Sequence, residues 1–259
     1  MKKLLLILLC LPFIGFGQQT YVPDDNFESY LEANGMGNGI ANDDSVTTAN
    51  INTVTSLLIE NQNISDLTGI EGFADLEYLY CGDNQLSSID VSQNDTLLFL
   101  SCNNNQLTSL DVSQNSYLMY LYCNDNQITN LDVSQNSVLY SLRCFNNQLA
   151  SLDVSQNSFL ESLYCNDNQI TNLDVSQNSI LYSLMCNDNQ LTTLDVSQND
   201  SLVYLYCADN LIYSLDVSNN TILGSFHCYD NQLTSLDVSN NTDLFWFNCD
   251  DNQLTSLDV

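Results

Sequence analysis

The sequence predicts a repeat solenoid, mainly β, in which short parallel strands stack coil upon coil next to an N-terminal helical cap. The first observation is a fixed period, because nine cysteines from Cys81 to Cys249 are spaced by 21 residues without a slip. The second is literal repetition, since the sixteen letters LYCNDNQITNLDVSQN occupy residues 121–136 and return at 163–178. A fixed period of roughly 20–50 residues is the mark of stacked repeat architectures.

Each coil is expected to contain two short strands, one per side, with turns at asparagines. The segments L-x-C and L-D-V alternate inward and outward side chains, which is the period of a strand. In the coil that starts at residue 118, the inward apolar residues are Leu118, Leu121, Cys123, Ile128, Leu131 and Val133. Two asparagine ladders, which begin at Asn84 and Asn94, are predicted to satisfy backbone N–H and C=O groups at the bends. A single coil cannot bury its apolar side alone, so stacking must stabilise the fold.

The first residues predict export. Lys2 and Lys3 precede an apolar stretch over 4–16, and small residues at Gly15 and Gly17 suit a cleavage site, as in a secretory signal peptide. We expect residues 1–17 to be removed and the protein to be secreted or placed at the cell surface. A lipid anchor at Cys10 is the alternative, although a large residue precedes it. No later segment has the roughly 18 continuous apolar residues of a transmembrane helix.

The charge of the exported chain restricts its partners. Without residues 1–17, Arg143 is the only basic side chain apart from the single histidine, against 32 Asp and Glu residues. Such a surface repels phosphate backbones and anionic membranes, which excludes nucleic-acid binding. A protein or polysaccharide ligand is the remaining expectation, with the chain itself monomeric.

The cysteines are predicted to be buried free thiols. Nine is an odd number, and all nine occupy one repeat position, so neighbours lie about 4.8 Å apart in stacked coils. A disulfide needs Cβ atoms near 3.8 Å and a specific dihedral angle, so these cysteines are expected to act as small hydrophobic residues.

Three segments are predicted: a signal peptide over 1–17, an N-terminal cap over 18–53 and the repeat solenoid over 54–259. Asp24, Phe27 and Leu31 suggest a short capping helix. The segment 34–44, NGMGNGIANDD, partly matches a calcium loop of the EF-hand type, but Met36 stands at a ligand position, and we interpret it as a cap loop. The sequence stops at Val259 inside L-D-V, which indicates an uncapped, truncated C-terminal end.

The two outward faces differ when the repeats are compared with one another. The second half of the coil carries aspartate in all nine copies, whereas the outward positions of the first half vary, and nine of their eighteen side chains are aromatic. Drift on a soluble surface favours Lys, Glu, Ser and Thr, while exposed aromatic residues on a rigid sheet favour recognition of protein or of sugar rings. The alternative is that the rings only pack on their neighbours along the sheet. The candidate ligand-binding residues are Tyr78, Tyr80, Phe99, Tyr120, Tyr122, Arg143, Tyr164, Tyr204, Tyr206, His227 and Trp246.

The aspartates form a ladder whose repulsion must be offset. Unit charges about 4.8 Å apart repel by roughly 1 kcal/mol even in water. Salt screening, raised pKa values, hydrogen bonds from Ser113-type hydroxyls and bound cations could each offset it. Calcium is a hypothesis, although one carboxylate per coil supplies too few ligands for a tight site. No dedicated metal site and no cofactor are predicted. Catalysis is not expected either, since no Ser or Cys nucleophile has a base nearby and the identical aspartates form no distinct acid pair.

The repeat also resembles a known family. In the coil from residue 118, five residues fit L-x-x-L-x-(L/C)-x-x-N-x-L, the leucine-rich-repeat pattern, and the coil halves into two such units, as in a nested bacterial class of 21-residue repeats. The resemblance covers about 54–259. The 22-residue variant over 54–79, VTSLLIENQNISDLTGIEGFADLEYL, resembles the first repeats of internalin-like surface proteins. This resemblance implies a non-catalytic module for adhesion or surface recognition. The alternative is a structural, calcium-stabilised acidic spacer.

Overall fold

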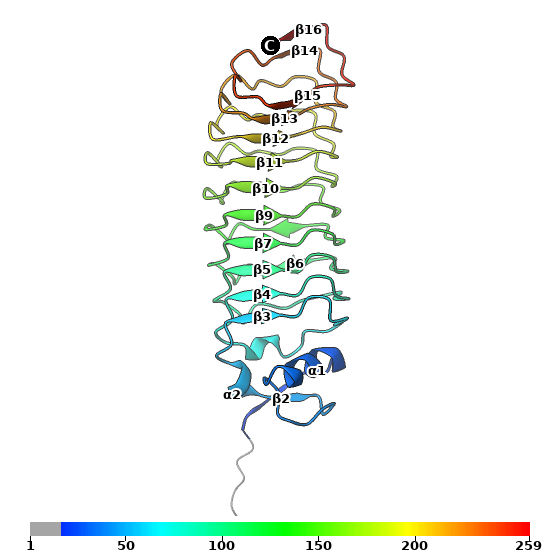
Figure 1. The fold of residues 1–259 in the computed structure, drawn as a ribbon, viewed down its shortest axis with the longest axis vertical. Coiled ribbons are helices and arrows are strands. Elements are labelled where there is room, and N and C mark those ends of the chain that lie inside the picture. The colour runs from blue at the N-terminus through cyan, green and yellow to red at the C-terminus, as the bar shows by residue number, and fades with distance from the viewer. Residues whose placement is uncertain (1–16) are drawn as a thin grey trace, which may run out of the picture.

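The computed structural model describes residues 17–259, so the predicted signal peptide lies outside the described residues except for Gly17. The chain forms a long stack of coils with helices at its N-terminal end (Figure 1). This arrangement confirms the predicted solenoid of parallel strands with a helical cap. The longest helix of the described chain has nine residues, too short to cross a bilayer.

One side of the solenoid is a ten-stranded parallel sheet, which we call the main sheet. Neighbouring strands pair at equivalent repeat positions, so Leu100 pairs with Leu79 on one side and with Leu121 on the other. The strands are β3 (Ser56–Leu58), β4 (Tyr78–Tyr80), β5 (Phe99–Ser101), β7 (Tyr120–Tyr122), β9 (Ser141–Arg143), β10 (Ser162–Tyr164), β11 (Ser183–Met185), β12 (Tyr204–Tyr206), β13 (Ser225–His227) and β15 (Trp246–Asn248).

The opposite side departs from the prediction of one strand per coil. Only two strand pairs form there: β6 (Leu110–Asp111) with β8 (Leu131–Asp132), and β14 (Ser235–Asp237) with β16 (Ser256–Asp258). The aspartate of L-D-V keeps this segment short in every coil, whether or not a strand pair forms. Asp132 Oδ1 accepts the backbone N–H of Ser134 at 2.9 Å, an Asx turn that takes the chain out of the extended conformation after two or three residues.

A continuous narrow core runs through the stack. The six predicted inward positions of the coil from residue 118 are all buried, and Leu131 is the most accessible of them at 5%. Burial of each Leu, Ile or Val side chain contributes about 1.5–3 kcal/mol. The predicted burial of the cysteines is confirmed for Cys81 to Cys228, while Cys249 in the last coil is half-buried, and the structure has all nine as free thiols.

The two asparagine ladders satisfy the backbone in different ways. Asn126 accepts the N–H of Leu107 at 2.9 Å and donates to the carbonyls of Cys102 and Cys123 at 3.0 and 3.2 Å, as predicted. Asn136 donates to two carbonyls, but among the described residues its Oδ1 accepts no hydrogen bond. The first ladder therefore meets the predicted role fully and the second only as a donor.

The N-terminal cap contains an antiparallel pair, β1 (Gln19–Tyr21) and β2 (Ser45–Thr47), with helices α1 (Asp25–Ala33) and α2 (Thr48–Ile51). A short 3-10 helix, η1 (Ile70–Gly72), follows in the first coil. The predicted helix of the cap is α1, and Asp24 is its N-cap, because the Oδ1 of Asp24 accepts the N–H groups of Asn26 and Phe27 at 3.0 Å. Its Oδ2 accepts the N–H of Ser65 at 2.8 Å, which ties the cap to the first coil. We propose the boundary between cap and solenoid at 53/54, between α2 and β3.

The loop over 34–44 is organised by carboxylates of α1. Glu32 accepts the N–H groups of Asn38 and Gly39, and the buried Glu28 accepts those of Asp43 and Asp44 at 3.1 and 3.2 Å. Asp25, Glu28 and Asp44 are the one carboxylate group in residues 17–259 whose oxygens lie close enough to share a cation. Both oxygens of Glu28 already accept backbone N–H groups, which agrees with the interpretation as a cap loop.

Candidate recognition face

All eleven candidate binding residues lie on the main sheet, two residues apart within a strand or at equivalent positions of neighbouring strands. We call their shared surface the aromatic face. Alternation within each strand places Leu79, for example, in the core and Tyr78 and Tyr80 outside. Tyr78 at 38% and Trp246 at 59% are exposed, and the other nine are half-buried.

The half-burial comes from contacts between neighbouring coils. Phe99 stacks on Tyr80, with ring centroids 4.6 Å apart and planes 28° apart, and meets Tyr122 edge-on at 5.1 Å. Such pairs contribute about 0.5–1.5 kcal/mol each beyond the area they bury. The alternative expectation, that the rings pack along the sheet, therefore describes their contacts correctly, and it does not remove their outer edges from solvent.

Arg143 occupies the position in β9 that Tyr122 and Tyr164 occupy in the neighbouring strands. Its guanidinium carbon lies 4.4 Å from the ring centre of Tyr122 and 5.2 Å from that of Tyr164, so the group lies between two rings. A cation in this position is attracted by the negative faces of the rings. The only basic side chain of the solenoid is thereby bound to the aromatic face.

His227 lies between Tyr206 and Trp246, with ring centroids 4.6 and 4.7 Å away. Burial lowers the pKa of His227, because the charged imidazolium would lose hydration there. The ring is therefore neutral at pH 7 and acts as one more aromatic group. Among the described residues its Nε2 has no hydrogen-bond partner.

Sequence reasoning missed a second exposed apolar row, which lies in the turn before each main-sheet strand and which we call the entry edge. Tyr117 is 63% and Phe159 59% exposed, and the row continues the aromatic face sideways, since Tyr140 meets Tyr120 at 5.7 Å. The sequence signal was an apolar residue directly after Asn-Ser or Asn-Thr in the repeat, or two positions later. The exposed members are Tyr117, Met119, Val138, Phe159, Ile180, Tyr182, Ile222 and Phe245.

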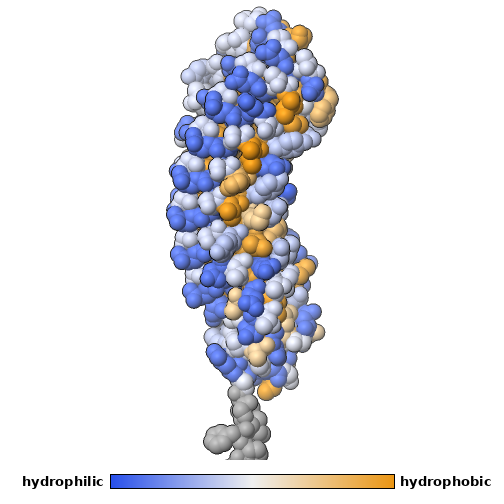
Figure 2. Space-filling view, turned by 90° about the vertical axis from the view of Figure 1, so that its left-hand side faces the viewer, coloured by the Kyte–Doolittle hydropathy of each residue, from blue (hydrophilic) through white to orange (hydrophobic). Residues whose placement is uncertain are grey.

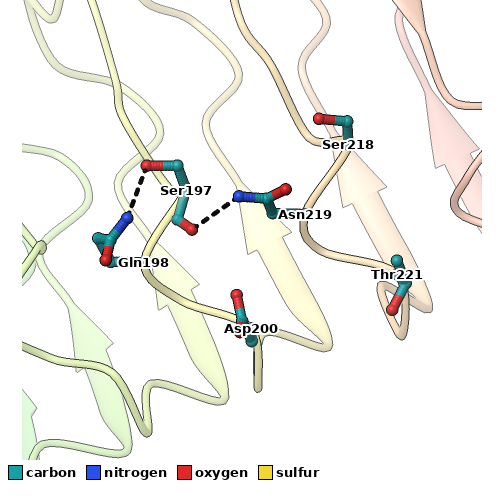
Figure 3. A pocket seen from close by; sticks show the side chains of 6 residues that line it. All are labelled: Ser197, Gln198, Asp200, Ser218, Asn219 and Thr221. Carbon is teal, nitrogen blue, oxygen red and sulfur yellow. Dashed lines mark hydrogen bonds between the residues drawn. The ribbon is translucent and has the colours of Figure 1, made fainter.

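A polar hollow lies between the turns of two neighbouring coils, at residues 197–200 and 218–221. Figure 3 shows its lining, in which Gln198 donates to the hydroxyl of Ser197 at 3.3 Å and Asn219 donates to the carbonyl of Ser197 at 3.1 Å. Asp200, Ser218 and Thr221 complete the lining. These side chains are small, polar and partly engaged with one another, so the hollow offers no apolar anchor.

The turn after each main-sheet strand carries a further acidic row, which we call the exit edge. Its residues adopt the left-handed conformation, with φ near 50°, which Asp and Asn tolerate. In two early coils an amide separates the charges: Asn104 donates to Asp83, and Asn146 donates to Asp125 at 2.5 Å. From residue 167 onward every coil has a carboxylate, and the row is Asp167, Asp188, Asp209, Asp230 and Asp251.

The two acidic rows differ in electrostatics. Burial, together with the charges of Asp188 and Asp230, raises the pKa of Asp209 on the exit edge. On the opposite side, hydrogen bonds from the backbone N–H and the hydroxyl of Ser134 lower the pKa of Asp132. The raised pKa values suggested for the aspartate ladder are therefore wrong, and the backbone N–H of Ser134, 2.9 Å from Asp132, is the main donor that favours the charged form, ahead of the predicted hydroxyl.

Comparisons with known proteins agree with this geometry, although no protein-family profile matches the chain. Internalin J of Listeria monocytogenes serotype 4b is 42% identical over 74 residues, which are 29% of this chain and 8% of that protein. The solved functional domain of InlJ from Listeria monocytogenes, described as including a cysteine ladder, is 34% identical with a TM-score of 0.64. That match covers 90% of this chain and 62% of the domain.

The structure of internalin InlF from Listeria monocytogenes has a TM-score of 0.82 at 26% identity, covering 92% of this chain and 76% of that one. A leucine-rich-repeat protein of Leptospira interrogans matches in fold, with a TM-score of 0.73 at 24% identity over 81% of this chain and 61% of that one. The chain thus spans less than two thirds of the InlJ domain and a small part of the whole internalin J. Repeat, cap, main sheet and cysteine row together identify the chain as an internalin-like leucine-rich-repeat protein, homologous to the Listeria internalins J and F.

Proposed function

We propose that this protein is a non-catalytic binding module that recognises another protein through its aromatic face, outside the cell or at its surface. The observation that supports this most directly is the row of interlocked rings, with Arg143 and His227 among them, on a rigid parallel sheet. These positions vary from coil to coil while the rest of the repeat stays nearly constant. Variable rigid aromatic positions on a constant scaffold are what a recognition surface requires.

Protein is the ligand class that the ring geometry favours over polysaccharide. Stacking on a sugar needs an open ring face, but neighbours along the sheet cover much of these faces. Tyr80 and Phe99 cover each other, and Arg143 lies against both Tyr122 and Tyr164. Ring edges and phenolic hydroxyls remain for contact, and they suit the mixed apolar and polar surface of a protein.

The surroundings of the titratable groups support binding rather than catalysis. His227 is the only histidine, and it lies between two rings where burial keeps it neutral. The cysteines that could serve as nucleophiles point into the core, where burial raises their pKa values. A nucleophile needs an adjacent base and access to substrate, which these positions do not offer.

The location outside the cell is part of the proposal. It depends on the signal peptide expected over residues 1–17 and on homology to the internalins. Detection of the chain beginning at Gln18 in the medium or on the cell surface would support it. Retention of the complete chain in the cytoplasm would contradict it.

The proposal can be tested by binding of the protein to a panel of extracellular proteins and polysaccharides. The test variant changes Tyr120, Tyr122, Tyr164, Tyr204 and Tyr206 to serine. A second variant changes the same residues to phenylalanine, which keeps the ring packing. The control changes Thr108, Thr129, Thr171 and Thr192, exposed in another turn, to serine.

We expect the serine variant to lose at least about tenfold in affinity for a protein ligand, because buried aromatic contacts dominate interfaces. The control should bind as the unchanged protein does. A serine variant that melts at a lower temperature but binds equally well would contradict the proposal. That result would favour the structural spacer, in which the rings only pack.

A further inference from the structure

The aromatic face lies between two edges of opposite character. Along each coil the entry edge comes first, then the three-residue strand, then the exit edge, so Phe159, Tyr164 and Asp167 follow one another within a single coil. This order repeats up the stack because the period is constant. If the aromatic face is a recognition surface, as proposed above, the two edges determine which protein it fits.

The entry edge is an apolar band. In the coils that carry Asp167 to Asp251 it exposes Phe159, Ile180, Ile222 and Phe245, at 59, 42, 43 and 72%, and Tyr117 and Val138 continue it toward the N-terminal end. Figure 2 views this edge directly and shows an apolar band along the length of the stack, with hydrophilic side chains beside it. A contiguous exposed apolar band on an otherwise polar protein marks an interaction surface.

The exit edge is an anionic band over the five coils from Asp167 to Asp251. No basic side chain of the described chain neutralises it, because Arg143 is held between Tyr122 and Tyr164 and no lysine lies in residues 17–259. Asn146 donates to Asp125 in an early coil, and Asn166 and Asn187 donate to Asp167 and Asp188 in this band. These amides are neutral, so the net negative charge of the band remains. Burial raises the pKa of Asp209, and the charges of Asp188 and Asp230 raise it further. A partner with positive charge at this edge would relieve the repulsion between these carboxylates.

The spacing of the two edges suits a helix. A strand of three residues is about 10 Å long, close to the 10–12 Å diameter of an α-helix with its side chains. Coils repeat about every 4.8 Å along the stack, and a helix advances about 5.4 Å per turn. A helix of about five turns, roughly 27 Å, would therefore extend over the five coils of the anionic band.

We propose that the aromatic face accepts a cationic amphipathic helix of a partner protein, lying along the axis of the solenoid. Its apolar side chains lie against the entry edge and the rings. Its Lys or Arg side chains reach the carboxylates of the exit edge. Charge argues against a second copy of this chain or an anionic membrane as the occupant, since both would bring negative charge to a negative surface.

The first arm of the test distinguishes the effect of where the carboxylates lie from the effect of the net charge of the protein. The probe is a synthetic peptide of about 18 residues, helical, with leucine on one face and lysine on the other; its binding is measured by fluorescence anisotropy at about 0.15 M salt. The test variant carries Asp167→Asn, Asp188→Asn, Asp209→Asn and Asp230→Asn. Asparagine occupies the same left-handed position at Asn104 and Asn146, so the backbone is preserved. The control carries Asp111→Asn, Asp132→Asn, Asp153→Asn and Asp174→Asn, with the same net charge.

We expect the exit-edge variant to bind about tenfold more weakly and the control to change by less than about twofold. Equal losses in both variants would show attraction to net charge alone and would overturn the proposal. Absence of binding by the unchanged protein would overturn it too. Melting temperatures of both variants, measured in parallel, exclude unfolding as the cause.

The second arm tests the apolar contact. Phe159→Ser with Ile180→Ser should weaken peptide binding several-fold, whereas Tyr21→Ser with Ile40→Ser, equally exposed in the cap, should not. A peptide of the same composition but scrambled, without an apolar face, should bind weakly. Equal binding of the scrambled peptide would overturn the proposal. Two further results would overturn it: tighter binding of the protein to zwitterionic vesicles than to the peptide, or dimerisation through the entry edge in analytical sedimentation. Ring-dependent binding of a protein ligand with none of these effects would leave the proposed function standing while this inference fails.

Discussion

At the scale of single residues, aspartates in different turns of one coil have opposite electrostatic roles. Asp132 starts an Asx turn, and hydrogen bonds from Ser134 favour its charged form. Asp209 has a left-handed backbone next to two further carboxylates, and its surroundings favour the neutral form. The same residue type therefore stabilises the fold in one turn and opposes it in another, because the donors within reach differ.

These directions predict opposite effects of charge removal. At pH 7 and low salt, Asp209→Asn should raise the melting temperature by about 1–2 °C, and Asp132→Asn should lower it by a similar amount. The folded pKa of Asp132 is lowered, so its contribution is present above the usual value of 3.8 and is lost as pH falls through the folded pKa. The folded pKa of Asp209 is raised, so its cost is present above that pKa and disappears below it. Thermal melts at pH 7 and pH 3 measure both, and the reverse order at pH 7 would contradict the assignment.

At the scale of elements, the nine cysteines line the core beside the main sheet, one at the end of each of its strands from β4 to β15. Each thiol follows a strand directly and points into the core, so Cys102, for example, is fully buried. Burial raises the pKa of Cys102 to about 12, which leaves almost no thiolate at physiological pH. Cys249 differs, because it lies in the last described coil and is half-buried.

This difference predicts selective alkylation. Under native conditions at pH 8, iodoacetamide should modify Cys249 first, giving one adduct on the chain that begins at Gln18. The other eight cysteines should react only as fast as the solenoid opens, because the thiolate is the reactive form and the core excludes the reagent. Mass spectrometry of peptides over time measures the order. Modification of Cys123 at the same rate as Cys249 would contradict the burial argument.

At the scale of the whole molecule, stability is a sum over neighbouring coils. The strand β9, for example, pairs only with β7 and β10, so a defect in one coil is felt mainly by the two beside it. At the N-terminal end the cap takes the place of a neighbouring coil, because the Asp24 carboxylate accepts a backbone N–H of the first coil.

Local coupling predicts a local response to a core defect. Leu142 on β9 is fully buried, and Leu142→Ala should cost about 2–5 kcal/mol of unfolding free energy. Hydrogen exchange should accelerate most in the coils around β9 and little in α1. Substitution of the exposed Thr129 by serine is the matched control. A uniform loss of protection along the chain would instead indicate a single cooperative unit.

Much of the fold could be predicted because the copies of the repeat within this one sequence can be aligned with one another. The period, the inward positions and the first asparagine ladder all followed from residues that recur every 21 positions. The side opposite the main sheet could not be predicted from L-D-V alone. Inward and outward side chains alternate over these three residues both in a strand and in a segment that enters an Asx turn. Asp132 lies in β8 and also accepts the N–H of Ser134, whereas Asp153 makes the same turn without a strand pair. The residues of L-D-V therefore do not determine whether a strand pair forms.

The candidate face was predictable in position but not in packing. Outward positions follow from alternation, whereas the contact of Phe99 with both Tyr80 and Tyr122 depends on side-chain rotamers. The entry edge was missed because Phe159 and Ile180 do not alternate with the strand, and the exit edge because the left-handed backbone of Asp209 leaves no mark in a hydrophobic pattern.

Because every coil from β4 onward has the same 21-residue length, one coil of the solenoid can replace another. Since residues 121–136 and 163–178 are identical, recombination between their coding segments would remove or add 42 residues without breaking a strand, a turn or a ladder. Such an exchange would leave the coil geometry unchanged while altering which rings and which carboxylates stand next to one another. The architecture can therefore acquire new surfaces by changing the order and number of its coils, with no new fold to be found.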